Sequence, residues 1–124
     1  AGTGLLKPNV ATMVGKLYLP RGPRDPRWTL WIELWARAAG NDALREAQVE
    51  LDRGWQEDLE ALLATGVARK RFAPLDTATR ASELLALLDG LSTRVVLGQG
   101  AEGALEVARS AARALVPRCA PAGR

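Results

Sequence analysis

Apolar side chains recur every three or four residues through most of this chain, which is the spacing of one face of an α-helix. The first such segment begins at Asp25 and Pro26, a capping residue followed by a residue suited to the first helical turn. Its apolar face carries Trp28, Trp31 and Trp35, three of the four tryptophans in the chain. The pattern therefore predicts a short helix with an aromatic stripe.

A second and longer helix is predicted after the Gly40-Asn41 break, with Asp42 as its cap and an end near Arg69–Arg71. Its apolar face is formed by Leu44, Ala47, Leu51, Trp55, Leu59, Leu62 and Leu63. The opposite face is acidic, and we interpret it as a solvated face rather than a cation site. It carries Glu46, Glu50, Asp52, Glu57, Asp58 and Glu60.

The C-terminal half predicts two more helices joined by a short glycine-containing loop. A connector with an anchoring Phe72 and a capping Asp76 leads into the third helix, at about Thr77–Leu97. Its leucines and valines cover more than one stripe, so we expect burial on two sides. The fourth helix, about Ala101–Val116, has an alanine-rich face that lets a neighbouring helix approach closely.

These two helices should form an antiparallel hairpin with one apolar face left over. A second copy of the chain would cover that face, so we predict an all-α fold whose last two long helices form an intermolecular four-helix bundle in a homodimer. In the alternative, the first two helices cover both faces within one chain. The predicted dimer interface consists of Leu91, Val95, Ala101, Ala104, Leu105, Ala108, Ala112 and Leu115.

The chain is long enough for one domain, at 124 residues. Residues 1–24 contain four glycines, three prolines and no acidic residue, so we expect an irregular segment or linker with at most a helical turn near residues 11–17. Residues 25–116 form the predicted domain. Residues 117–124 follow a helix-stopping proline, and we expect a disordered tail there.

The amino-acid composition limits the kinds of functional site that the chain could hold. The chain has no histidine and a single cysteine, Cys119, which we interpret as an ordinary thiol, so neither a metal site nor a cofactor is expected. The net charge of +3 comes from scattered arginines and does not indicate a nucleic-acid surface. No apolar run is long enough for a membrane span, and a cytoplasmic, non-enzymatic protein is the best interpretation. An enzyme that uses carboxylates such as Glu57 and Asp58 is a minor alternative.

A family resemblance appears in the order and spacing of several motifs. They are the aromatic helix WTLWIELWARAAG, then NDALREA, the pattern W...L..LL..G, the connector with Phe72 and Asp76, and finally ELLALLDGL. Together they resemble the C-terminal region of TetR-family transcriptional regulators over about three quarters of the chain. Only 24 residues precede this region and they carry no recognisable helix-turn-helix, so we expect operator DNA to be bound through an N-terminal domain outside this chain.

The resemblance implies an effector-binding and dimerisation domain, in which a small molecule alters operator binding by a repressor or an activator. We predict an apolar or aromatic effector, because the residues available to wall a pocket are mostly rings and leucines. The predicted pocket residues are Trp31, Trp35, Trp55, Leu59, Leu84 and Leu88. Glu33, Arg37, Arg80 and Arg94 are the candidate polar anchors. Trp28, near the helix start, is expected to be only partly buried. The alternative function is a helical protein-interaction module whose tryptophans simply fill the core.

Overall fold

The computed structural model describes residues 20, 22–23 and 25–120, except for the side chains of residues 101 and 102. Within these residues the fold consists of four α-helices and no named strand, which confirms the predicted all-α class. The helices are α3 (Pro26–Ala38), α4 (Asp42–Ala68), α5 (Thr77–Val96) and α6 (Ala101–Leu115).

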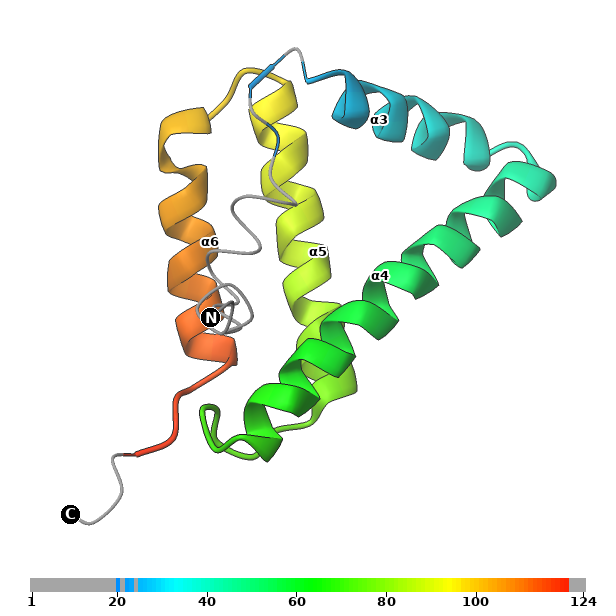
Figure 1. The fold of residues 1–124 in the computed structure, drawn as a ribbon. Helices are drawn as coiled ribbons and strands as arrows, with labels where there is room; N and C mark the ends of the chain where they lie inside the picture. The colour runs from blue at the N-terminus through cyan, green and yellow to red at the C-terminus, as the bar shows by residue number, and fades with distance from the viewer. Residues whose placement is uncertain (1–19, 21, 24, 121–124) are drawn as a thin grey trace, which may run out of the picture.

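Helix α5 is the centre of the arrangement, because it contacts each of the other three helices. Helix α6 runs antiparallel beside it, and α4 crosses it near its N-terminal end (Figure 1). Helix α3 spans the distance from the other end of α5 to the start of α4, so that α3, α4 and α5 form the three sides of a triangle (Figure 1). The predicted burial of the third helix on two sides is therefore provided by α4 and α6 of the same chain.

The start of α3 follows the predicted capping pattern. Asp25 Oδ1 accepts a hydrogen bond from the backbone N–H of Arg27 at 3.1 Å, and Pro26 occupies the first helical position. The Asp25 carboxylate is buried and also pairs with the Arg27 guanidinium at 3.1 Å. This pair holds the pKa of Arg27 above its usual value. The Asp25 side chain thus caps the N-terminus of α3 and also pairs with the positive charge of Arg27.

Helix α4 is capped one residue earlier than expected. The side chain of Asn41, not of Asp42, accepts the hydrogen bond from Leu44 N, at 3.1 Å. Asp42 is the first helical residue and pairs with Arg45 at 3.5 Å. Both residues suit a helix N-terminus, and the backbone conformation of Asn41 decides which of them serves as the cap.

The C-terminal end of α4 is shaped by Gly66 and Phe72. The carbonyl of Gly66 accepts hydrogen bonds from Arg71 N and Phe72 N, and Lys70 adopts the left-handed conformation that such a helix end requires. The Phe72 ring folds back onto Gly66 so closely that a Cβ at this position would overlap it. Gly66 therefore lies inside the helix as a site of close approach, and Phe72 is the expected anchor.

The structure describes residues 117–120 of the segment expected to be a disordered tail, and they form hydrogen bonds with the rest of the chain. The N–H of Ala73 donates to Pro117 O at 2.9 Å, and the N–H of Cys119 donates to Arg71 O at 2.9 Å. The Cys119 thiol donates to the carbonyl of Phe72 at 3.1 Å. The segment after α6 therefore pairs with the connector between α4 and α5, which supplies the backbone partners that the sequence pattern did not reveal. Residues 121–124 lie outside the described residues, as does the helical turn expected near residues 11–17.

The buried core lies where α4, α5 and α6 meet. Leucines from α4 and α5 interlock there with small side chains of α6, which allow the helices to approach closely. The cluster comprises Leu59, Leu63, Phe72, Ala81, Leu84, Leu88, Ala108, Ala112 and Val116.

Candidate functional site

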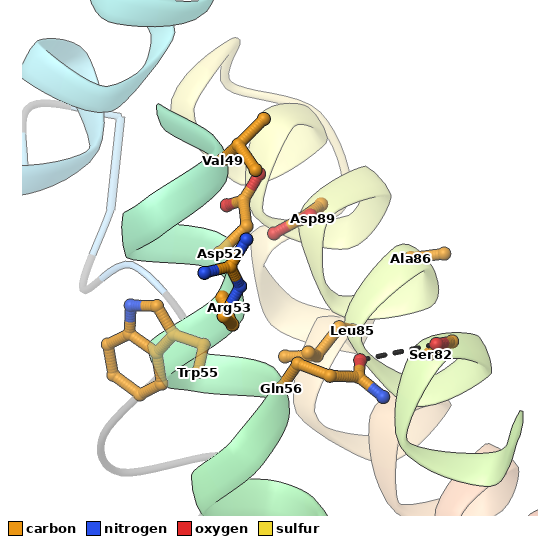
Figure 2. A pocket seen from close by; sticks show the side chains of 9 residues that line it. All are labelled: Val49, Asp52, Arg53, Trp55, Gln56, Ser82, Leu85, Ala86 and Asp89. Carbon is orange, nitrogen blue, oxygen red and sulfur yellow. Dashed lines mark hydrogen bonds between the residues drawn. The ribbon is translucent and has the colours of Figure 1, made fainter. Parts of the chain in front are cut away.

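A pocket of about 510 Å³ lies between α4 and α5, on the side of their crossing that faces the N-terminal half of α4 (Figure 2). Helix α4 supplies five of its residues at helical spacing, and α5 supplies the other four. The lining residues are Val49, Asp52, Arg53, Trp55, Gln56, Ser82, Leu85, Ala86 and Asp89.

The pocket combines apolar surface with two carboxylates, Asp52 from α4 and Asp89 from α5 (Figure 2). The one cationic side chain among the lining residues, Arg53, pairs with Glu50 at 2.8 Å. Partial burial raises the pKa of Asp52, because the ionised carboxylate loses part of its hydration. A positively charged group in the pocket would offset that loss, whereas an anionic group would add to it.

Gln56, one of the residues that line the pocket, forms a polar link between α4 and α5. Its Nε2 donates to the carbonyl of Ala78 at 3.0 Å. Its Oε1 accepts a hydrogen bond from Ser82 Oγ at 3.2 Å (Figure 2). Both partners lie on one face of α5, four residues apart. One amide side chain thus joins α4 to the first turns of α5.

The tryptophans do not share one site. Trp55 is 40% exposed and lines the α4–α5 pocket, whereas the rings of α3 are absent from its lining. On α3, the Trp35 ring lies 6.0 Å from that of Trp28 and 6.2 Å from that of Trp31, measured between centroids. The expected partial exposure of Trp28 is wrong, since only 6% of it is exposed. Trp28 lies close in sequence to the buried Asp25 cap, so its side chain is buried in the protein rather than exposed at a frayed helix end.

The three predicted pocket leucines lie in the core instead of lining this pocket. Leu59, Leu84 and Leu88 are each at most 5% exposed and pack in the α4–α5–α6 cluster. Leu85, one residue further along α5, lines the pocket. One residue corresponds to about 100° around a helix, so the predicted set points into the core and its neighbour points into the pocket.

The candidate polar anchors for a ligand also lie outside the lining of this pocket. Arg80 pairs with Glu83 at 2.9 Å on α5, and Glu33, Arg37 and Arg94 are exposed. The residues missed by sequence reasoning are mainly polar ones. Val49, Asp52, Arg53 and Gln56 recur at a spacing of one, three or four residues, and only Asp52 among them belongs to the acidic face that the sequence analysis interprets as solvated. That periodicity was the available signal.

Most of the residues predicted to form the dimer interface are buried or partly buried within the single chain. Val95, Ala104, Ala108 and Ala112 are at most 5% exposed, because they pack α5 and α6 against each other and the core. Leu91, Leu105 and Leu115 are half-buried against the same cluster, and the side chain of Ala101 lies outside the described part of the chain. The outward face of α6 instead exposes Val107, at 48%.

Other classes of site find little support in the described residues. No group of three or more acidic, cysteine or histidine side chains in this part of the chain could hold a metal ion. The carboxylates of Glu57 and Asp58 are exposed and lie outside the pocket. None of the described helices has the length and apolar character needed to cross a membrane.

Comparison with known proteins places the chain in a family. Residues 10–121 match the family profile described as the C-terminal part of BetI-type transcriptional repressors. Searches of curated proteins and of solved structures gave no significant match. The family match covers most of the chain and confirms the resemblance to the C-terminal domain of TetR-family regulators.

Proposed function

The chain belongs to the family of BetI-type transcriptional repressor C-terminal domains, and we propose that it is the effector-sensing and dimerising part of such a repressor. The family supports a regulatory rather than an enzymatic role. In this proposal operator DNA is bound through a helix-turn-helix domain, and ligand binding to the present domain alters that interaction. The cytoplasm is the corresponding location.

The α4–α5 pocket is the observation that carries the sensing proposal. Its volume of about 510 Å³ suits a small molecule, and Trp55, Val49 and Leu85 offer apolar surface. Partial burial disfavours the ionised carboxylate of Asp52, so an apolar or aromatic compound with a positive charge fits better beside it than an anionic one. Trp55 also lines the pocket, with its indole on the side of α4 turned away from α5 (Figure 2).

Two probes of nearly the same shape and opposite charge test this proposal. Tetraphenylphosphonium and tetraphenylborate would each be titrated into the protein, with binding measured by calorimetry and by tryptophan fluorescence. We expect saturable binding of the cation and weaker binding of the anion. Preference for the borate would contradict the proposed charge selectivity. Failure of both probes, together with a wider panel of hydrophobic compounds, would favour the alternative of a helical protein-interaction module.

The dimerisation proposal needs a surface other than the predicted one. The outward face of α6 presents Gly103, Val107 and Ala114, all exposed and spaced four and seven residues apart. Small side chains on this face would let two α6 helices approach closely, and the α5–α6 hairpins of two copies would then form a four-helix bundle.

Light scattering after size exclusion would measure the mass of the wild type and of the variant Val107→Glu. We expect a dimer for the wild type and a shift toward monomer for the variant, because a buried, unpaired carboxylate is costly. Arg113→Glu is a control, since Arg113 is also exposed on α6 and already pairs with Glu106 at 3.0 Å. A monomeric wild type at micromolar concentration would refute dimerisation through this domain.

A further inference from the structure

We infer that Gln56 is a latch which a ligand must release to enter the α4–α5 pocket fully, so that occupancy of the pocket loosens the crossing of α4 on α5. This inference rests on the proposed sensing function and concerns the regulation of the same site. It is carried by the position of Gln56, by the atoms it joins and by the different packing of α4 on either side of it.

Gln56 lies at a boundary along α4. Toward the C-terminus, Leu59 and Leu63 are at most 5% exposed and Gly66 is buried, so this part of the helix is fixed in the core. Toward the N-terminus, Val49 and Leu51 are about half exposed, at 50% and 48%. The N-terminal half of α4 runs away from α5 (Figure 1), and Gln56 is among the residues that line the pocket on that side.

The hydrogen bonds of Gln56 are the described side-chain hydrogen bonds that join α4 to α5. Its amide nitrogen donates to Ala78 O at 3.0 Å and its amide oxygen accepts from Ser82 Oγ at 3.2 Å. Gln56 and Ser82 both line the pocket. A compound wedged between the helices at this point would contact the two side chains that hold the helices together.

Such a link is well suited to release. Gln56 and Ser82 both carry neutral groups, and the bonds lie at the surface, where water competes for every donor and acceptor. Breaking them costs little compared with opening the leucine core below. The free energy spent on release subtracts from the binding free energy of the ligand, as for any protein that must leave its resting state in order to bind. Removing the latch by mutation should therefore strengthen binding.

The affinity of tetraphenylphosphonium would be measured by calorimetry for the wild-type chain and three variants. Gln56→Leu keeps the size of the side chain and removes both hydrogen bonds, and we expect it to bind about threefold to tenfold more tightly. Ser82→Ala removes one bond, and an increase of about twofold to threefold is expected. Gln48→Leu is the matched control, because Gln48 is half-buried on the same helix but does not line the pocket, and its affinity should equal that of the wild type.

Amide hydrogen exchange provides the second measurement. The probe should accelerate exchange at residues 77–82 in the wild type, and Gln56→Leu should show faster exchange there without any probe. Equal affinity in all four proteins, or weaker binding by Gln56→Leu, would overturn the latch while leaving the pocket in place. Absence of binding to every variant would overturn the pocket, and the coupling with it.

Discussion

The two halves of α4 have different roles although the same apolar spacing runs through both. In the C-terminal half, Leu59 and Leu63 are buried against α5 and α6. In the N-terminal half, Leu51 and Trp55 are 48% and 40% exposed, and the helix borders a pocket. The comparison shows that periodicity locates a helix and its apolar side, whereas the neighbours available at each turn decide whether that side becomes core or site.

The largest expected difference between the halves is in stability. Leu63→Ala should lower the free energy of unfolding by about 2–5 kcal/mol, because Leu63 is fully buried and its truncation leaves a cavity. Leu51→Ala, the same change in the exposed half, should cost less than about 0.5 kcal/mol. Urea unfolding followed by circular dichroism would measure both. Equal losses for the two variants would contradict the division of α4 into a packed and an open half.

A glycine-to-alanine pair sharpens the same comparison. Gly66→Ala should destabilise by about 1–3 kcal/mol, since the new methyl group overlaps the Phe72 ring and overpacks the end of α4. Gly54→Ala, in the open half, meets nothing within 4 Å and should stabilise by about 1 kcal/mol through helix propensity. Thermal unfolding of the two variants gives the sign directly, and stabilisation by Gly66→Ala would show that the Phe72 contact is not tight.

Several features of the fold could be predicted from the sequence for clear physical reasons. The cap at Asp25, the proline at the first position of α3 and the cap at Asp76 are local, so short segments contain the information. Helix types and approximate bounds follow from apolar spacing in the same way. The neighbours of each face are not local, and that is where the predictions were wrong or incomplete.

The alanine face of α6 illustrates this limit. Its spacing correctly indicated a close helix neighbour, but that neighbour is α5 of the same chain, as the burial of Ala104, Ala108 and Ala112 shows. The pocket shows the same limit for residues that the sequence pattern assigned to solvent. Asp52 and Gln56 form part of the site because α5 lies opposite them, and an acidic helix face has the same appearance in sequence whether it borders water or a pocket.

The smallest predicted effect concerns the pH dependence of Asp52. Burial raises its pKa in the folded state, so folding is favoured while the group is protonated, and this contribution is lost as pH rises through the folded pKa. Asp52→Asn should therefore become slightly more stable than the wild type as pH rises from about 3 to 7, by well under 1 kcal/mol because water screens the site. Asp58→Asn, on an exposed part of α4, is the control for charge removal. If Asp52→Asn instead became less stable than the wild type as pH rises over this range, burial could not be the cause of the raised pKa.

The central claim is that Trp55, at the open half of α4, is the tryptophan of the ligand site. Fluorescence titration with tetraphenylphosphonium would be compared for the wild type, Trp55→Phe and Trp31→Phe. We predict that the saturable change in emission disappears in Trp55→Phe and persists in Trp31→Phe, because Trp55 lines the pocket and Trp31 packs beside Trp35 on α3. An unchanged response in Trp55→Phe, with loss of the response in Trp31→Phe, would place the ligand at α3 and contradict this account.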